Sequence, residues 1–157
     1  MAVKMRKFAI ITGIVLLILG IQSCAGSAAA KNADIADIRE KDWILDEVKT
    51  GTASVKINRT GSTNEVFTLK LDAERISGVA APNRYFGPYT AGEKQALTVG
   101  MMAGTMMAPL FEREDLKEQD YMKYLEKINR WKLNNGKLEL YTVDGSGKEA
   151  VLIYIEK

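Results

Sequence analysis

The side chains that could perform chemistry are few in this 157-residue sequence. It contains no histidine and a single cysteine, Cys24. Ser-His-Asp and Cys-His catalysis, histidine general bases and histidine zinc sites are therefore excluded. Any catalysis would depend on carboxylates, lysine, tyrosine, serine or threonine.

Five carboxylates lie close together between residues 112 and 120. A pair of carboxylates can act as general acid and base, as in glycoside hydrolases, but only at a suitable separation across a cleft. Here basic residues are interleaved with the acids, which is typical of a solvated helix face. We interpret these residues as such a face and expect no enzyme: Glu112, Glu114, Asp115, Glu118 and Asp120.

Four of the seven methionines fall within "MMAGTMM", residues 101–107. Thioether sulfurs are good ligands for Cu(I). In a continuous strand, however, Met101 and Met107 would face one side and Met102 and Met106 the other. We therefore interpret the run as adaptable filling of the core, and we expect neither a metal nor another cofactor.

The segment "VAAPNRYFGPYT", residues 79–90, contains two of the three prolines and three aromatic residues. In an extended segment Tyr85 and Tyr89 share one face, with Gly87 between them. Two interpretations remain open. The segment is either a buried, hydrogen-bonded corner that closes a sheet, which we favour, or an exposed aromatic platform for a peptide or glycan.

The first 24 residues resemble a bacterial lipoprotein signal. A basic start precedes an uncharged run over 8–21, which is shorter than the roughly 20 residues that span a bilayer. "GIQSC" then places Cys24 where a lipobox requires it. We expect cleavage before Cys24, a diacylglyceryl group on its thiol and a fatty acyl chain such as palmitate on the new amine. Two or three acyl chains give stable anchoring.

These features divide the chain into a signal peptide (1–23), a lipidated N-terminus and flexible tether (24–41) and one domain (42–157). One helical turn is expected within 33–40. Subtracting the three basic residues of the leader from the chain's 22 leaves 19, against 20 acidic residues, so we expect no nucleic-acid partner. Residue 25 is alanine, not the aspartate that retains some lipoproteins in the inner membrane. We expect attachment to the outer membrane, facing the periplasm.

Alternating apolar and polar residues predict the strands that position these features. The expected strands are 43–48, 54–59, 66–71, 74–81, 96–100, short pieces within 101–107, a hairpin over 130–143 with Asn135-Gly136 at its turn, and 150–156. Residues 111–129 instead follow a helical period, with Tyr121, Tyr124, Leu125 and Ile128 on one face. The pattern predicts an α+β fold: a curled, barrel-like antiparallel sheet of about eight strands with one main α-helix packed on it.

Several spaced elements of the domain resemble the META domain, or HslJ-like, family. Matches to the family pattern are Trp43 and Leu45 near the start, Ser77, Gly78, Asn83, Tyr85, Gly87 and Tyr89 in the centre, and Thr105, Met107 and Ala108 after it. The two cysteines of the family pattern fall on Pro82 and Pro109, so any role of that pair elsewhere is not carried over. We take seven residues as the candidate fold or binding motif: Asn83, Arg84, Tyr85, Gly87, Tyr89, Thr105 and Met107.

The resemblance implies a small envelope or secreted module, often a lipoprotein, associated with heat or antibiotic stress in bacteria, and it implies no catalytic residues. We expect the membrane lipid, through Cys24, and an envelope protein or peptide as partners. The alternatives are a carrier or inhibitor that holds a small ligand or peptide in a cavity of the curled sheet, and a hydrolase that uses carboxylates and tyrosine.

Overall fold

The computed structural model describes residues 33–59, 66–108 and 113–157. The expected leader, Cys24, most of the tether, Pro109 and Glu112 lie outside these residues. Lys31–Lys157 forms one compact unit. Within the described ranges, no helix is long and apolar enough to cross a membrane.

The described residues form one antiparallel sheet of ten strands. The strands are β1 (Asp42–Thr50), β2 (Ala53–Lys56), β3 (Thr68–Leu71), β4 (Arg75–Ala80), β5 (Asn83–Ala91), β6 (Leu97–Val99), β7 (Ala103–Gly104), β8 (Arg130–Asn134), β9 (Lys137–Val143) and β10 (Glu149–Glu156).

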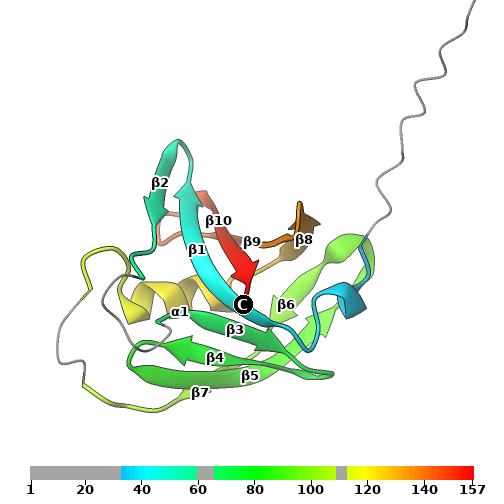
Figure 1. The fold of residues 1–157 in the computed structure, drawn as a ribbon, viewed down its shortest axis with the longest axis horizontal. Coiled ribbons are helices and arrows are strands. Elements are labelled where there is room, and N and C mark those ends of the chain that lie inside the picture. Colours follow the sequence, from blue (N-terminus) through cyan, green and yellow to red (C-terminus); the bar gives the residue numbers. More distant parts are fainter. Residues whose placement is uncertain (1–32, 60–65, 109–112) are drawn as a thin grey trace, which may run out of the picture. The chain divides into compact units, whose positions relative to one another are not determined.

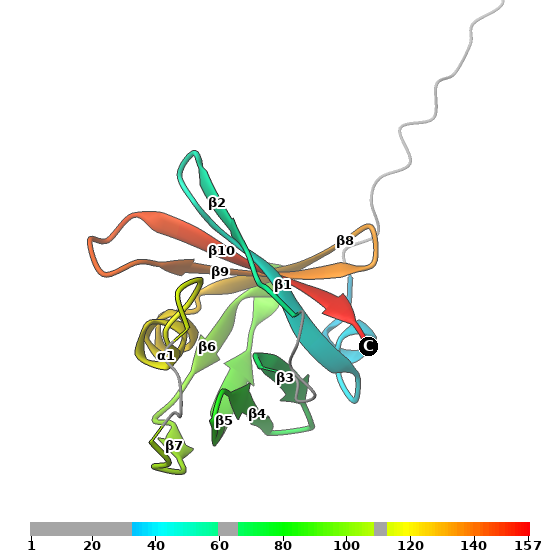
Figure 2. The same cartoon turned by 60° about the vertical axis from the view of Figure 1, so that its left-hand side comes forward.

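Eight of the strands follow one curled path in the order β6-β5-β4-β3-β1-β10-β9-β8, as Figures 1 and 2 show. The two ends of the path meet where the Leu97 amide donates a hydrogen bond to the Asn129 carbonyl at 3.2 Å. An isolated bridge between Ala96 and Arg130 lies beside this bond. The sheet is thus a nearly closed barrel, and the predicted fold class is confirmed. The short strands β2 and β7 lie off the path, paired with β1 and β5.

The helix α1 (Glu118–Glu126) packs on the sheet, and it is shorter than the predicted 111–129. The predicted apolar face is confirmed, because Tyr121 and Leu125 are fully buried and Ile128, just beyond the helix, is almost so. Glu118 and Asp120 lie in the first turn, where negative charge is favourable.

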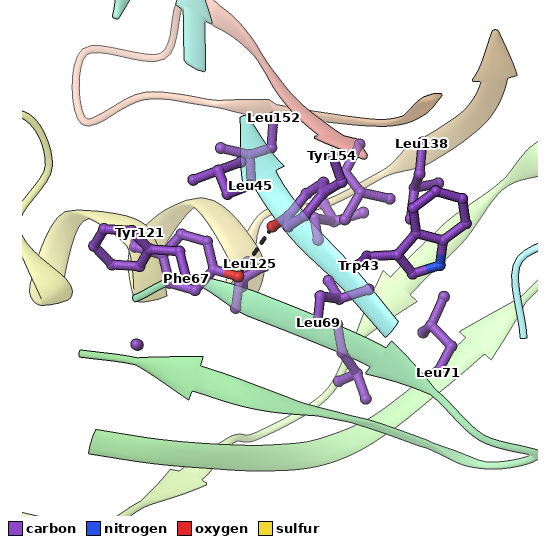
Figure 3. Packing of buried hydrophobic residues seen from close by; sticks show 14 of the residues in the cluster. Trp43, Leu45, Phe67, Leu69, Leu71, Tyr121, Leu125, Leu138, Leu152 and Tyr154 are labelled. Atoms are coloured by element: carbon purple, nitrogen blue, oxygen red, sulfur yellow. Dashed lines mark hydrogen bonds between the residues drawn. The ribbon is translucent and has the colours of Figure 1, made fainter. Parts of the chain in front are cut away.

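Large side chains fill the interior of the barrel (Figure 3). The largest fully buried ones are Trp43, Trp131, Tyr121, Tyr154 and Phe67. The Trp43 indole nitrogen donates to the Ile38 carbonyl at 3.0 Å. No buried side-chain nitrogen or oxygen in the described ranges lacks a hydrogen-bond partner. The interior is therefore a packed core whose polar atoms are satisfied.

The predicted hairpin after the helix is confirmed. Asn135 and Gly136 connect β8 to β9 with φ of 50° and 76°. A two-residue turn of type I′ needs positive φ at both central residues, and Asn-Gly is the pair that adopts it most readily.

Three strand predictions differ from the structure. Residues 83–91, which were not among the expected strands, form β5. The half-buried strand expected over 54–59 is the exposed strand β2 (Ala53–Lys56), and Ile57, just beyond it, is buried. In the methionine run only Ala103–Gly104 forms a strand, and the core-filling interpretation was wrong for three of the four methionines. Met101, Met106 and Met107 are 91%, 98% and 54% exposed, because the chain leaves the sheet on both sides of β7.

The packed structure also reaches into the segment that we assigned to the tether. The expected helical turn is a 3-10 helix at Ile35–Asp37, capped by Asp34. Ile38 after it is fully buried in the core. Its side chain and its bond to Trp43 join this segment to the barrel.

Candidate functional site

The motif segment is the strand β5, which follows a turn at Ala81–Pro82, joined by a cis peptide bond. Strand alternation buries Asn83, Tyr85, Gly87 and Tyr89 and exposes the residues between them. The interpretation as a buried, hydrogen-bonded element is therefore confirmed, although the corner is confined to the turn. The aromatic platform is not formed, because of the three aromatic residues of the segment only Phe86 is substantially exposed, at 47%.

Asn83 binds three segments at once. Its Oδ1 accepts hydrogen bonds from the Thr105 hydroxyl at 2.8 Å and from the Met107 amide at 2.7 Å. Its Nδ2 donates to the Met107 carbonyl at 3.1 Å and to Glu118 Oε2 at 2.9 Å. We call these four residues the Asn83 latch. It joins the start of β5 to the chain after β7 and to the first turn of α1.

The latch uses the full hydrogen-bonding capacity of the Asn83 amide, two donors and two acceptors. The side chain is 6% exposed, so each of these bonds replaces a bond to water. The hydroxyl of Thr105 also accepts from the Arg84 amide at 3.1 Å, and the Thr105 amide donates to the Arg84 carbonyl at 3.0 Å. The structure thus brings together Asn83, Thr105 and Met107 of the predicted motif, and only the backbone of Arg84.

Tyr85 begins a chain of buried hydroxyls that crosses the core. Its hydroxyl donates to the Thr68 carbonyl at 2.8 Å and lies 3.1 Å from the hydroxyl of Tyr121. The Tyr121 hydroxyl in turn lies 3.0 Å from that of Tyr154 (Figure 3). We call Tyr85, Tyr121 and Tyr154 the tyrosine chain. Burial, and then the proximity of the neighbouring tyrosines, raises the pKa of all three well above the usual value of 10.0.

Gly78 allows this arrangement because β4 passes very close to the tyrosine chain. A Cβ at Gly78 would lie 2.0 Å from the Thr68 carbonyl oxygen and 2.7 Å from the Tyr85 hydroxyl. No side chain fits into that space, which is a common reason for glycine inside a strand. Gly87 is similar, since its Cβ would lie 2.9 Å from Cγ of Met102.

Tyr89 connects the segment before β1 to the barrel. Its hydroxyl donates to the Asp72 carbonyl at 2.6 Å and accepts from Arg39 Nε at 2.6 Å. Arg39 also donates to the Ala73 carbonyl at 3.2 Å. Tyr89 therefore fixes Arg39, within the expected tether, against the turn between β3 and β4.

Several residues of this site were not found from the sequence. Glu118 was assigned to a solvated helix face, but it accepts a hydrogen bond from the buried Asn83 amide. Asp115 was also misassigned, since it binds the Arg113 side chain and the Asn58 amide. One signal was available for Tyr121, because it lies on the apolar face of the helix and a buried tyrosine hydroxyl needs a partner.

An open groove of about 430 Å³ lies between the β1–β2 hairpin and the start of α1. Its lining is apolar at Val48, Val55, Leu116 and Tyr124 and charged at Glu114, Lys117, Asp120 and Lys123. Among the described strands, β2 pairs with β1 alone. No group of three or more histidine, cysteine, aspartate or glutamate side chains in the described part of the chain is arranged to hold a metal ion.

The family pattern of the META domain matches residues 36–154, and the chain belongs to this family. Among solved structures, the chain is similar to the NMR structure of a protein from Burkholderia xenovorans, with a TM-score of 0.60 and 21% identity over 78% of this chain and 85% of the other. A second NMR structure, of a protein whose organism is not stated, has a TM-score of 0.56 and 20% identity, over 78% and 94%. These similarities concern the fold alone. A search of curated protein sequences found no significant match.

The Asn83 latch makes a prediction about stability. We expect Asn83→Ala to lower the free energy of unfolding by about 2 kcal/mol, because it leaves Glu118 and the Met107 backbone without their partner. Chemical denaturation followed by tryptophan fluorescence measures the change. Arg84→Ala is the matched control, and because that side chain is exposed we expect a change within about 0.5 kcal/mol. Equal stability of the Asn83 variant and the wild type would contradict the role given to the latch.

The tyrosine chain predicts loss of stability in alkali. Above pH 10 the unfolded chain releases its tyrosine protons, while the folded chain keeps them because the folded pKa values are raised. The free energy of unfolding should therefore fall by about 1.4 kcal/mol per pH unit for each of the three tyrosines. Denaturation between pH 9 and pH 11, roughly the range around the tyrosine pKa, measures this slope. Tyr154→Phe should reduce this slope by about 1.4 kcal/mol per pH unit, the contribution of one tyrosine. A free energy of unfolding in the wild type that does not change with pH in this range would show that the three tyrosines do not have raised pKa values.

Proposed function

We propose that the protein is a lipid-anchored envelope protein whose META domain is a non-enzymatic interaction module. The observation that carries this proposal is the packed interior of the barrel, since Trp43, Phe67 and the tyrosine chain occupy the space that a carrier would use for its ligand. Apolar side chains stand instead on the outside. Apolar surface of this kind is often used to bind partners.

The groove beside β2 is the surface that best fits a protein partner. Among the described strands β2 pairs only with β1, so its other edge is open, and Val55 on it is 41% exposed. An extended peptide can add to such an edge through backbone hydrogen bonds, while pockets beside the edge select its side chains. The hairpin is already held in place, because Asp46 binds Lys56 at 3.0 Å and Arg59 at 3.2 Å. We propose that the partner contributes an extended segment to this groove.

A second candidate is a small-ligand carrier, and the size of the groove favours it. Pockets for small ligands have volumes of roughly 300–1,000 Å³, and the groove is within that range at about 430 Å³. The groove is open, however, and five of its thirteen lining residues are charged. We therefore place the peptide first.

The sequence features at Cys24 and Ala25 lead us to propose the outer membrane, facing the periplasm, as the location. The family resemblance implies a role in heat or antibiotic stress. We propose that the protein binds its partner under such stress. Nucleic acid is not among the proposed partners, since the domain's charge is close to neutral.

The anchor makes a prediction for Cys24→Ala. This variant has no thiol to accept the diacylglyceryl group, so we expect it to lack lipid and to leave the detergent phase in a detergent partition of whole cells. Mass spectrometry of the N-terminal peptide measures the attached lipid directly. A lipid-bearing N-terminus in the variant would refute the anchor.

The groove makes a prediction for crosslinking in cells. A photoreactive benzoylphenylalanine at Val55 should give a discrete protein adduct under heat or antibiotic stress, because it lies on the proposed contact edge. The same residue at Thr98, which is exposed on β6, is the control and should give no such adduct. Identical adducts at both positions, or none at Val55, would argue against a partner in the groove.

A further inference from the structure

Four exposed apolar side chains lie on β5 and on the chain that runs beside it on either side of β7. They are Phe86, Met101, Met106 and Met107, with exposed fractions of 47%, 91%, 98% and 54%. We call them the methionine edge. Phe86 lies opposite Ala103 of β7, and a Cβ on Gly87 would be 3.1 Å from the Met101 carbonyl oxygen. The Met107 backbone binds Asn83, so the edge follows β5 from residue 83 to residue 87, roughly 13 Å.

The backbone beneath the methionine edge is fixed. Both the amide and the carbonyl of Met107 bind the Asn83 side chain, and Thr105 binds Arg84. The exposed Met107 side chain is therefore presented by a backbone that is held in place. A surface that is ordered before binding loses little entropy when a partner covers it.

Two arginines flank this apolar edge on the outer face of the sheet. Arg84 is exposed next to the latch, and the Arg75 guanidinium lies 5.0 Å from the centre of the Phe86 ring. Neither forms a salt bridge with a described residue. Asp72 is close enough to interact with the charge of Arg75, so Arg84 is the stronger of the two positive sites.

An apolar edge beside two arginines that form no salt bridge with a described residue matches the interface of an anionic bilayer. Phenylalanine and methionine side chains can enter the boundary between headgroups and acyl chains, while arginine binds lipid phosphates. The anchor brings this interface within reach. From Cys24 to Ala33 the chain can span at most roughly 30 Å, so an anchored domain always meets the bilayer at a high effective concentration.

We propose that the methionine edge, with Arg84 and Arg75, docks the domain on the anionic phospholipid surface to which Cys24 attaches it. The proposal rests on the proposed lipid anchor. It also gives the domain an orientation, because β7 and the β1–β2 hairpin lie at opposite ends in both views (Figures 1 and 2). A domain docked through the methionine edge points the β1–β2 hairpin away from the membrane.

A tryptophan placed in the methionine edge tests the docking. The protein of residues 24–157 has one thiol, Cys24, which can be coupled to a maleimide lipid in vesicles of phosphatidylcholine with or without phosphatidylglycerol. The vesicles carry brominated acyl chains, which quench tryptophan on contact. The native Trp43 and Trp131 are 0% and 2% exposed in the core and provide a constant background. The test variant is Met106→Trp, and Lys148→Trp, in the exposed turn before β10, is its matched control.

We expect the tryptophan of Met106→Trp to shift to the blue and to be quenched on the vesicles with phosphatidylglycerol, and that of Lys148→Trp to stay unquenched. Adding Arg84→Glu should weaken docking by about thirtyfold, because it removes one positive charge and adds one negative charge near an anionic surface, each worth about 1 kcal/mol. Quenching that is equal for both tryptophans, or equal with and without the anionic lipid, would overturn the proposal.

Two further results keep this proposal separate from the others. A blue shift that grows with protein concentration without vesicles would assign the edge to a second copy of the chain and overturn docking on lipid. Because the maleimide replaces the natural anchor, the docking result does not depend on lipidation in the cell. A lipid-bearing N-terminus in Cys24→Ala would therefore refute the natural anchor and leave the docking result unchanged.

Discussion

The structure depends on one buried amide whose four hydrogen bonds are all made. Asn83 holds the start of β5, the chain after β7 and the first turn of α1 together, and no single apolar residue could make these contacts. Leaving one of these partners unpaired would cost more than the bond itself is worth, since a buried polar group loses its water. The latch therefore favours this arrangement of the three segments. Any other arrangement would leave at least one of these buried polar groups without a hydrogen bond.

The latch also separates the two kinds of surface on β5. The inward side chains form hydrogen bonds inside the fold: Tyr85 belongs to the tyrosine chain, and Tyr89 accepts a hydrogen bond from Arg39. The outward side chains of β5 are exposed to solvent. The hydrogen-bonded backbone of Met107 holds part of the methionine edge beside them. The inward residues of the motif are therefore buried in the fold, and the contacts that we propose for function lie beside the motif.

The sequence predicted the barrel and its helix because alternation and the period of 3.6 are local signals, as at 130–143 and on the face with Tyr121. It missed contacts that need the third dimension. Glu118 looked like one of several solvated acids, since nothing near it in sequence indicates that Asn83, 35 residues earlier, would reach it. The methionine run was assigned to the core from composition, but hydrophobicity alone cannot distinguish a core residue from an exposed binding residue.

The most direct test of the latch is amide hydrogen exchange at Met107, followed by NMR. Its side chain is 54% exposed, yet its amide donates to the buried Asn83 at 2.7 Å. The account predicts that this amide exchanges as slowly as the amides of β5, and that the amide of the neighbouring Met106, which has no acceptor among the described residues, exchanges quickly. Fast exchange at Met107, while β5 remains protected, would contradict the claim that Asn83 holds this segment on the barrel.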